Sequence, residues 1–376
     1  MVIKMNEWKN IKIGDVGKIV TGSTPPTSDK ENYGNDYSWV SPADLGKTKY
    51  IENTLTKLSK KGFDKTRKIP AKSILVTCIG STIGKMGMTK IEMSTNQQIN
   101  SIIVNKEVYD ENFIYYCINY NFPKFLNKIA SQAVPIISKS EFEKLEIKAP
   151  SLVEQIKIGT ILNLLDKKIE LQSKKIEALK LYKLCIKEML FARAVTSETK
   201  LSNVLKKWNG KNKNNQYSYV ESVSNKHGFI AQNEQFDDRS VASNDKTNYY
   251  IIRKNVFAYN PSRLDVGSLA LKENDVVSLV SPLYECFTTN QDVHFMYEWF
   301  NSKEFRKGTY SKFEGGVRNT LNFSNLCDIK ISLPSITEQN KISQALCVFN
   351  NKIKLEEDKY KCLLELKKGL MQSMFV

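Results

Sequence analysis

PSLVEQ at residues 150–155 and PSITEQ at residues 334–339 open two stretches of the chain that repeat each other. Residues 147–191 align without a gap with residues 331–375, at a constant separation of 184 positions, and about a third of the paired residues are identical. A period this long exceeds the roughly 20–50 residues of solenoid repeats. The chain is therefore predicted to contain a duplicated module that presents two equivalent sites.

Each hexapeptide has the pattern of a helix start. The hydroxyl of Ser151 or Ser335 can accept a hydrogen bond from an amide of the first turn. Glu154 or Glu338 can reach back to the amide of that serine, which completes a capping box. The proline before each serine keeps the incoming strand out of the helix. Both stretches are therefore predicted to be long helices with the same starting geometry.

Beyond the caps, apolar residues recur at heptad spacing over four heptads, as in a coiled coil. The residues predicted to pair the two helices are Leu162, Leu165, Ile169, Ile176, Leu179, Leu346, Phe349, Ile353, Leu363 and Leu370. Lys183 and Lys367 interrupt the two seams at the same place, and a polar seam residue fixes register at some cost in stability. Each helix of roughly 40 residues would be about 60 Å long. Two independent amphipathic surface helices are the alternative, but the matching caps, register and lysines favour pairing.

The repeat extends weakly into the segments between the helices. Residues 37–40 resemble 217–220, residues 72–75 resemble 254–257, and residues 94–97 resemble 288–291. The separation drifts from 180 to 194 positions, so these segments carry insertions and deletions that the helices lack. Two binding domains on one scaffold that read different targets would have this pattern.

Short β-branched runs and spaced aromatic residues predict a mixed α/β fold for each segment. Strands are predicted at residues 74–79, 99–104, 249–252 and 276–280, and helices at residues 113–129 and 296–305. The expected order is an α/β domain over residues 1–150, a long helix over 151–193, a second α/β domain over 194–334 and a second long helix over 335–376. Each domain has an ordinary size for a globular unit.

The chain is strongly basic. Its 376 residues include 56 Lys and Arg against 40 Asp and Glu, a formal net charge of +16. Such an excess favours a polyanionic partner through counterion release and long-range attraction. No apolar run approaches the roughly 18 residues of a membrane span, and the start of the chain lacks the apolar stretch of a secretory signal. We therefore expect a cytoplasmic protein whose polyanionic partner is nucleic acid.

The residues that usually carry catalysis or bind metals are sparse. The seven cysteines are scattered without a Cys-x-x-Cys pair, and there are two histidines, His227 and His294. This pattern predicts reduced thiols and neither a metal site nor a disulfide framework. Two isolated histidines make a catalytic triad improbable. No enzyme activity and no cofactor of its own is expected for the chain.

Two segments resemble cofactor-binding motifs without matching them. GSTIGK, residues 80–85, has three residues between its glycines where a phosphate loop has four, and Met86 stands where Ser or Thr would hold magnesium. A glycine-rich turn ending in Lys85 still suits a DNA phosphate, because bare backbone amides can approach it closely. A turn without any ligand is the alternative. NPSR, residues 260–263, resembles the Asn-Pro-Pro-Tyr loop of adenine methyltransferases but lacks the second proline and the aromatic residue.

Two variable domains, each followed by a long helix that opens with Pro-Ser-x-x-Glu-Gln, resemble the specificity (S) subunit of type I restriction-modification systems. The resemblance covers the whole chain. GSTIGK is common in the recognition domains of that family, whereas the second-domain counterpart, RLDVGS at residues 263–268, lacks the lysine. The shared use of this loop by both domains is therefore an open question at the level of sequence.

The resemblance implies a non-catalytic reader of double-stranded DNA with a fold of two α/β target-recognition domains. Each recognition domain would bind one half of a split, asymmetric sequence, and the two helices would pair antiparallel as a spacer. Two methyltransferase subunits, which carry S-adenosylmethionine, would dock on the helical pair. In this family, motor-nuclease subunits join the same assembly for restriction.

DNA contacts require Lys, Arg and small polar groups for phosphates, and Arg, Asn, Gln, Ser or Thr for base edges. The candidates in the first domain are Ser23, Thr24, Arg67, Lys85, Gln97 and Gln98. The candidates in the second domain are Arg239, Asn260, Arg263, Gln291 and Arg318. A solvated surface position is the alternative for each of them.

Two other classes of function compete with the DNA reader. A coiled-coil scaffold with basic faces would bind nucleic acid without sequence choice, and its affinity would fall uniformly with salt. An enzyme with unrecognised chemistry would require activity from the purified chain alone.

Overall fold

The computed structural model describes residues 8–129, 135–194, 196–225, 228–232, 245–264, 267–310, 312 and 320–375. The chain divides into two compact units, and each of them contains one α/β domain and a part of both long helices. Unit 1 consists of Met1–Lys175 and Glu356–Val376, and unit 2 consists of Ile176–Leu355. The long helices are α5 (Leu152–Arg193) and α10 (Ile336–Met374).

The α/β domain of unit 1 is built on two mixed sheets. Its strands are β1 (Lys9–Lys12), β2 (Gly17–Thr21), β3 (Tyr33–Val40), β4 (Tyr50–Ile51), β5 (Thr56–Leu58), β6 (Lys68–Ile69), β7 (Ile74–Thr77), β8 (Met86–Thr89), β9 (Met93–Thr95), β10 (Ile99–Val104) and β11 (Glu146–Ala149). Its shorter helices are α1 (Ile13–Val16), α2 (Lys60–Asp64), α3 (Glu111–Ile129) and α4 (Lys139–Lys144). One sheet has the order β2-β10-β7-β8-β4, the other has the order β5-β3-β9-β6, and β1 pairs with β11.

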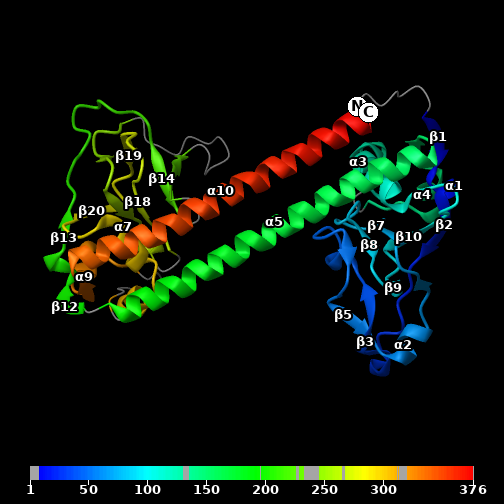
Figure 1. The fold of residues 1–376 in the computed structure, drawn as a ribbon, viewed down its shortest axis with the longest axis horizontal. Helices are drawn as coiled ribbons and strands as arrows, with labels where there is room; N and C mark the ends of the chain where they lie inside the picture. Colours follow the sequence, from blue (N-terminus) through cyan, green and yellow to red (C-terminus); the bar gives the residue numbers. More distant parts are fainter. Residues whose placement is uncertain are drawn as a thin grey trace. The chain divides into compact units, whose positions relative to one another are not determined.

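Alternation along the strands of the first sheet places two apolar cores on its two faces. Val76 and Ile102 face the core that α3, the start of α5 and the end of α10 complete (Figure 1). Leu75 and Ile99 face the core between the two sheets. The first sheet is thus covered on both faces, and the loops at its ends carry the exposed polar groups.

The α/β domain of unit 2 repeats the central part of this plan. Its strands are β12 (Thr196–Lys200), β13 (Leu205–Lys207), β14 (Glu221–Ser224), β15 (Gly228–Ala231), β16 (Tyr250–Ile252), β17 (Phe257–Tyr259), β18 (Leu269–Leu271), β19 (Ser278–Val280), β20 (Glu285–Thr289) and β21 (Lys330–Pro334). Its shorter helices are α7 (Val293–Phe300), α8 (Lys303–Tyr310) and α9 (Phe323–Cys327). The order β13-β20-β17-β18 corresponds to β2-β10-β7-β8, and the β12–β21 pair corresponds to β1–β11.

The repeated hexapeptides begin the two long helices in the same way. Ser151 and Ser335 accept hydrogen bonds from the amides of Glu154 and Glu338 at 3.4 and 3.3 Å, as predicted. The predicted return bond from each glutamate to the serine amide is absent from these described residues. The next residue, a glutamine, closes the turn instead: its side-chain amide donates to the proline carbonyl at 2.9 Å in both copies.

The same two glutamines join each helix to its domain. Gln155 accepts a hydrogen bond from the amide of Asp110, and Gln339 accepts one from the amide of Asp292, both at 3.1 Å. Asp110 and Asp292 in turn accept from the amides of Phe113 and Phe295. This repeated chain of bonds fixes the start of α5 against α3 and the start of α10 against α7.

The long helices run antiparallel where they meet. In unit 1, Asp166 near the start of α5 binds Lys367 near the end of α10, and Gln172 binds Glu356. In unit 2, Leu190 from the end of α5 packs into the same core as Leu346 from the first half of α10. The fold is therefore two α/β domains combined with an antiparallel helical pair in an internally repeated pattern. No helix among the described residues is long and apolar enough to cross a membrane.

The structure corrects three details of the predicted repeat. The helix predicted at residues 296–305 is two helices, α7 and α8, with a break at Asn301 and Ser302. Residues 94–97 begin in β9 and lead into the start of β10, whereas residues 288–291 are the end of β20 and the residues after it, so these two segments are not counterparts. The counterpart of Lys72 is Asn255 rather than Lys254, because these two residues share a positive φ of 66° and 67° and the same inter-strand hydrogen bond.

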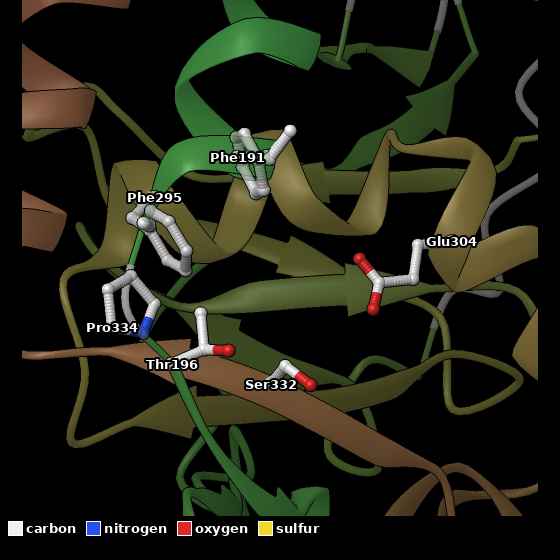
Figure 2. A pocket seen from close by; sticks show the side chains of 8 residues that line it. Phe191, Thr196, Phe295, Glu304, Ser332 and Pro334 are labelled. Atoms are coloured by element: carbon white, nitrogen blue, oxygen red, sulfur yellow. The ribbon is translucent and has the colours of Figure 1, made fainter.

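A cavity of about 160 Å³ in unit 2 marks a difference between the two copies (Figure 2). Phe191, Phe295 and Thr196 are among the residues that line it. The register of β1–β11 and β12–β21 makes Trp8 of unit 1 the counterpart of Thr196. In unit 1 the indole of Trp8 packs on the ring of Phe113, with ring centroids 5.7 Å apart, so a large side chain lies where unit 2 has the cavity.

Candidate nucleic-acid interface

Three loops of unit 1 meet at one end of its first sheet. They are the turn at residues 22–26 after β2, the loop at residues 78–85 between β7 and β8, and the turn at residues 96–98 before β10. The register pairs Thr21 with Asn100 and Thr77 with Ile99, which places all three loops at the same end. We call these loops the first polar edge.

A close backbone approach fixes the turn at residues 22–26. The amide of Gly22 donates to the carbonyl of Ile99 at 3.0 Å, and the amide of Ser23 donates to the carbonyl of Thr95 at 2.8 Å. A Cβ atom on Gly22 would lie 2.0 Å from the carbonyl oxygen of Asn96, so this position requires glycine. The turn is therefore seated directly on the segment that leads into β10.

Arg67 holds the same turn from its other side. Its guanidinium Nη1 donates to the carbonyls of Thr21 at 2.7 Å and Gly22 at 3.2 Å, and its amide donates to Ser23 Oγ at 3.0 Å. The indole of Trp39 adds a bond to the carbonyl of Ser23 at 3.0 Å. Arg67 and Ser23 are thus engaged in holding the turn, and they act as positioning residues.

The exposed groups of the first polar edge are amides, a hydroxyl and an ammonium group. The hydroxyl of Thr24 binds the side-chain oxygen of Gln97. Gln98 spans from Asn96, at 2.9–3.0 Å, to the carbonyl of Ile79, at 3.4 Å, and so joins two of the loops. Lys85 is exposed at the end of the third loop. The structure therefore brings all six first-domain candidates to this edge or to its direct support.

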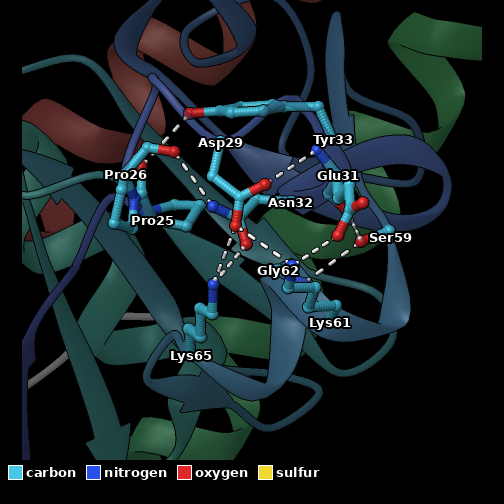
Figure 3. A network of polar contacts seen from close by, with 10 residues as sticks. All are labelled: Pro25, Pro26, Asp29, Glu31, Asn32, Tyr33, Ser59, Lys61, Gly62 and Lys65. Atoms are coloured by element: carbon cyan, nitrogen blue, oxygen red, sulfur yellow. Dashed lines mark hydrogen bonds and ion pairs between the residues drawn. The ribbon is translucent and has the colours of Figure 1, made fainter.

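A network behind the turn holds it rigid (Figure 3). The side-chain amide of Asn32 donates to the carbonyl of Pro26 at 2.9 Å, and the hydroxyl of Tyr33 donates to the carbonyl of Pro25 at 3.3 Å. Lys65 binds both the side-chain oxygen of Asn32, at 2.8 Å, and Asp29, at 3.2 Å. Hydrogen bonds from Lys61 and then Lys65 lower the pKa of Asp29, so the carboxylate stays ionised and keeps both lysines in place.

Unit 2 has a second polar edge at the equivalent end of its sheet. The register pairs Tyr259 with Glu285, so the residues that follow β17 lie beside the turn at residues 281–284 before β20. Asn260 caps the 3-10 turn Pro261–Arg263 and accepts from the amide of Ser262 at 3.1 Å. The guanidinium of Arg263 is exposed at this turn. The loop from β17 to β18 thus corresponds to GSTIGK by topology, but its exposed cation is Arg263 near the start of the loop, whereas Lys85 is at the end of its loop.

The other second-domain candidates do not join this edge. Gln291 lies at the opposite end of β20, where its side-chain oxygen accepts a hydrogen bond from Gln339 at 2.8 Å. Arg239 and Arg318 lie outside the described residues. The amide of Leu321 donates to the carbonyl of Pro261 at 3.1 Å, so Leu321 lies beside the second polar edge.

Sequence reasoning missed the segment that follows β13. The amide of Trp208 donates to the carbonyl of Cys286 at 2.8 Å, as Gly22 does to Ile99, so residues 208–211 are the counterpart of the turn after β2. Lys211 is exposed in this segment, and its ammonium lies 5.6 Å from the ring centroid of Tyr250. The signal was present in the run KKWNGKNKNN, in which lysines alternate with turn-forming Asn and Gly.

The residues predicted to pair the helices differ in burial. Leu162, Leu165, Ile176, Leu346 and Ile353 are buried. Ile169, Leu179, Phe349, Leu363 and Leu370 are half-buried. The described residues contain no group of three or more His, Cys, Asp or Glu side chains that could hold a metal ion.

A cationic cluster joins the first domain to α5. The ammonium of Lys49 donates to Asn112 at 2.7 Å and to Asn163 of α5 at 2.8 Å, and it lies 4.3 Å from the ring centroid of Tyr116. Burial lowers the pKa of Lys49 to about 8, although the charge of Asp166 opposes the change. The lysine is therefore a polar contact between domain and helix that titrates at mildly alkaline pH.

The family model described as the type I restriction modification DNA specificity domain matches residues 5–181 and 198–365 of the chain. The chain belongs to this family. Each of the two matches takes in one α/β domain with its polar edge and most of the long helix that follows, so the duplicated module of the sequence is the family's domain present twice.

Named relatives in the specificity-subunit family align over different shares of the chain. The type I restriction enzyme HindI specificity subunit of Haemophilus influenzae is 38% identical over 149 residues, which cover 38% of this chain and 32% of the relative. The MjaIX specificity subunit of Methanocaldococcus jannaschii is 33% identical over 179 residues, which cover 46% and 41%. These two alignments span less than half of either relative. The MjaVIII specificity subunit of the same organism is 22% identical over 400 residues, which cover 97% of this chain and 91% of the relative.

Solved structures share the fold over the full chain. The S subunit of the type I restriction-modification system from M. genitalium superposes with a TM-score of 0.63 at 15% identity and covers 100% of this chain and 98% of its own. A chain from a study of complex assembly and conformational transition of the type I R-M system gives a TM-score of 0.58 at 14% identity, with 98% of both chains covered.

Proposed function

We propose that this chain is the DNA sequence-specificity subunit of a type I restriction-modification complex and reads a bipartite target with its two recognition domains. The observation that carries the proposal is the repeated polar edge. In both units three loops lie at the same end of equivalent sheets, and their exposed side chains include Lys85 and Gln97 in unit 1 and Lys211 and Arg263 in unit 2. Family membership and the net charge of +16 agree with DNA as the ligand of these edges.

The first polar edge suits the reading of base edges. Gln97 offers an exposed side-chain amide, which can form a bidentate pair with adenine, and the hydroxyl of Thr24 can donate or accept. Gln98 uses both side-chain polar atoms to join two of the loops and so supports the position of Gln97. Lys85 adds a charge suited to a backbone phosphate. Gly22 and Arg67 hold Thr24 on a fixed turn, so little backbone conformational entropy of that turn is lost on binding.

The second polar edge differs in its charged groups. Arg263 can bind guanine bidentately through its planar guanidinium, and Asn260 can pair with adenine. Lys211 supplies the charge for a phosphate. Because the two edges carry different side chains on equivalent loops, the two halves of the target are expected to differ in sequence.

The helices carry a repeated apolar surface that suits two copies of one partner. Exposed apolar residues stand at counterpart positions: Leu164 and Val348, Leu171 and Leu355, and Tyr182 and Leu366, each more than half exposed. Unit 1 presents Leu164, Leu171 and Leu366, and unit 2 presents their counterparts. Contiguous exposed apolar groups are typical of protein interfaces. Two methyltransferase subunits, one on each copy of this surface, are the proposed partners.

The catalytic work is assigned to those partners. The adenine-methylating chemistry and its S-adenosylmethionine would belong to the methyltransferase subunits, and motor-nuclease subunits would add restriction to the same assembly. The chain itself would position the methyltransferase subunits on the DNA and select the DNA sequence. It would do so in the cytoplasm, where the DNA and these partners are found.

Base-modification sequencing of host DNA tests the reading function. The methyltransferase partner is kept constant while the gene for this chain is present, absent or mutated. We expect methylated adenines in a split motif only when the chain is present. Gln97→Ala and Lys85→Ala should weaken or relax the first half of the motif, and Arg263→Ala should relax the second half. An identical methylation pattern with and without the chain would rule out this function and favour a sequence-independent scaffold.

Two variants serve as matched controls for the reading experiment. Lys106 is exposed beyond the opposite end of β10, so Lys106→Ala removes a charge from the first domain away from its polar edge. Lys303 binds Glu188 of α5 at 2.8 Å, so Lys303→Ala does the same in the second domain. Both should leave the motif unchanged. A motif altered equally by the control and the edge variants would show a general loss of affinity instead of lost readout.

The number of methyltransferase subunits per chain tests the docking surfaces. Leu171→Glu should remove one partner, Leu355→Glu should remove the other, and the double variant should bind none, as measured by the mass of the assembly in solution. Leu181→Glu is the control, because Leu181 is exposed but its counterpart in α10 is Glu365. Full assembly by the double variant would refute this assignment of the docking surface.

A further inference from the structure

Gln172 and Glu356 are counterparts of each other in the two helical copies, and they bind each other. The side-chain amide of Gln172 donates to Glu356 Oε2 at 2.7 Å and to the carbonyl oxygen of Glu356 at 2.9 Å. In an antiparallel pair of repeated helices, counterpart residues can meet only at the pseudo-two-fold axis. This bond therefore marks the centre of the repeat, and the two copies differ there by one charge.

The lysines around this bond obey the same symmetry. Lys175 binds Glu356 Oε1 at 2.9 Å, and Lys359 binds the same oxygen at 3.3 Å. Lys175 and Lys359 are also counterparts of each other. The side chain of Glu356 is only 5% exposed, whereas both lysines are half-exposed. One buried carboxylate is thus shared by two symmetry-related cations and one amide, and we call these four residues the central lock.

Pairing of like copies would give a different centre. Two helices of the first kind would place Gln172 against Gln172 and leave two Lys175 ammonium groups without an anion. Two helices of the second kind would place two Glu356 carboxylates against each other, and like charges in direct contact are unfavourable unless one of them gains a proton. A single polar position in a helical seam is known to specify register and pairing partner at a cost in stability.

We propose that the central lock is a pairing code: each helical copy accepts a helix of the other kind and rejects its own kind, because the centre requires one carboxylate and one amide. The partner that α5 fits is a helix with a carboxylate at the counterpart of Gln172. The code would keep the two halves of one chain together and disfavour association of either helix with its own kind in a second copy of the chain. The inference depends on helix pairing and not on the proposed DNA reading.

Four versions of the full chain test the code. Glu356→Gln creates an amide–amide centre, and Gln172→Glu creates a carboxylate–carboxylate centre. Because Lys175 and Lys359 are symmetry-related, these variants reproduce the two like pairs within the intact chain. The double variant Gln172→Glu/Glu356→Gln exchanges the two groups and restores one carboxylate and one amide. The measurement is the midpoint of thermal unfolding at neutral pH, with the mass in solution as a second readout.

We expect both single variants to unfold about 5 °C below the wild type, because each loses hydrogen bonds to a charged group. The exchanged double variant should return to within about 2 °C of the wild type, since its contacts are the same with the helices interchanged. Glu365→Gln, on an exposed position of α10, is the control for loss of a carboxylate and should have no effect. An exchanged variant that is as unstable as the two singles combined, or a Glu356→Gln variant as stable as the wild type, would overturn the proposal.

Discussion

Lys183 and Lys367 occupy the same position in the two helical copies, yet they bind carboxylates on different elements. Lys367 binds Asp166 of α5 at 2.6 Å, whereas Lys183 binds Glu298 of α7. The counterpart of Asp166 is Asn350, whose side-chain amide lies 3.5 Å from Glu298. The lysine position is therefore the same in both copies, whereas its carboxylate partner lies in the long helix α5 in unit 1 and in the domain helix α7 in unit 2. Each copy thus has one carboxylate for its seam lysine, and a different element supplies that carboxylate in each copy.

Glu298 is the group on which this contact depends in unit 2. Burial raises the pKa of Glu298, but the charges and hydrogen bonds of Lys183 and Lys187 outweigh burial and hold the pKa below its usual range. Glu298→Gln would leave two largely buried ammonium groups without a carboxylate. We expect the free energy of unfolding to fall by about 3 kcal/mol, as for other buried pairs that lose one partner. Urea unfolding at neutral pH measures the change.

The control for Glu298 is an exposed ion pair that also joins α5 to a short helix of unit 2. Glu188 of α5 and Lys303 form an ion pair that is exposed to solvent. Glu188→Gln should therefore leave the midpoint of urea unfolding unchanged. Equal effects of Glu188→Gln and Glu298→Gln would contradict the special role given to the buried carboxylate.

The repeat could be predicted from sequence because helix capping and heptad spacing are local patterns. The serine caps and the positions of both long helices are found where the sequence places them. The bond of Gln155 to Asp110 could not be predicted, because it joins residues 45 positions apart through the backbone of a different element. The prediction of a single helix at residues 296–305 was wrong because aromatic residues occur on both sides of the break at Asn301. The spacing of apolar residues alone does not reveal such a break.

The first polar edge was largely foreseen, since Gly-rich turns and Asn-Gln pairs are local signals. The second was foreseen only at Asn260 and Arg263. The similarity of residues 94–97 to 288–291 led to Gln291, which lies at the other end of its strand. A short polar match does not carry strand direction, whereas the hydrogen-bond register does, and the register makes residues 281–284 the counterpart of the turn before β10.

Lys49 gives unit 1 a dependence on alkaline pH. Its pKa is about 8 in the folded chain, against 10.5 ordinarily, mainly because of burial. Between these two values the unfolded chain holds a proton that the folded chain has released, so stability rises with pH in this window. Lys49→Met removes the titrating group. We expect the stability of the wild type relative to Lys49→Met to increase from pH 8 to about 10, as measured by chemical unfolding at each pH.

The opposite result for Lys49 is equally easy to recognise. A wild-type advantage that stays constant or decreases from pH 8 upward would mean that the ammonium keeps its proton between Tyr116 and Asn163. Comparison with the variant at each pH cancels the titration of the surrounding tyrosines.

Glu356 gives the same unit a dependence on acidic pH. The hydrogen bond from Gln172 and then that from Lys175 lower the pKa of Glu356 from 4.5 to about 2. The contribution of the carboxylate to stability is therefore complete above pH 4.5 and is lost as the pH falls toward 2. We expect the difference between wild type and Glu356→Gln to shrink over this window, as followed by thermal unfolding. A difference that is independent of pH would exclude ionisation of Glu356 as its source.

Gly22 should be the most sensitive backbone position of the first polar edge. In Gly22→Ala the new Cβ would meet the carbonyl oxygen of Asn96, so the turn at residues 22–26 must move. We expect a loss of about 2 kcal/mol in stability and a relaxed first half of the methylated motif with an intact second half. Gly369→Ala is the matched control: among the described residues, no atom outside the adjacent backbone of α10 lies within 4 Å of the new Cβ position. It should stabilise the helix by about 0.5–1 kcal/mol and leave the motif unchanged.

The cavity that Phe191, Phe295 and Thr196 line in unit 2 should accept an indole like that of Trp8 in unit 1. The two rings stack with centroids 5.0 Å apart, and Thr196 stands where Trp8 stands in unit 1. Thr196→Trp places an aromatic side chain in the cavity of about 160 Å³ and buries apolar surface now open to water. We expect a gain of about 1 kcal/mol, seen as a higher midpoint of thermal unfolding. The reciprocal Trp8→Thr should lower stability by more, because it opens a cavity against Phe113 and Phe375. A Thr196→Trp variant that unfolds earlier than the wild type would show that the cavity cannot take the ring, and that the two copies differ there in backbone as well as in side chain.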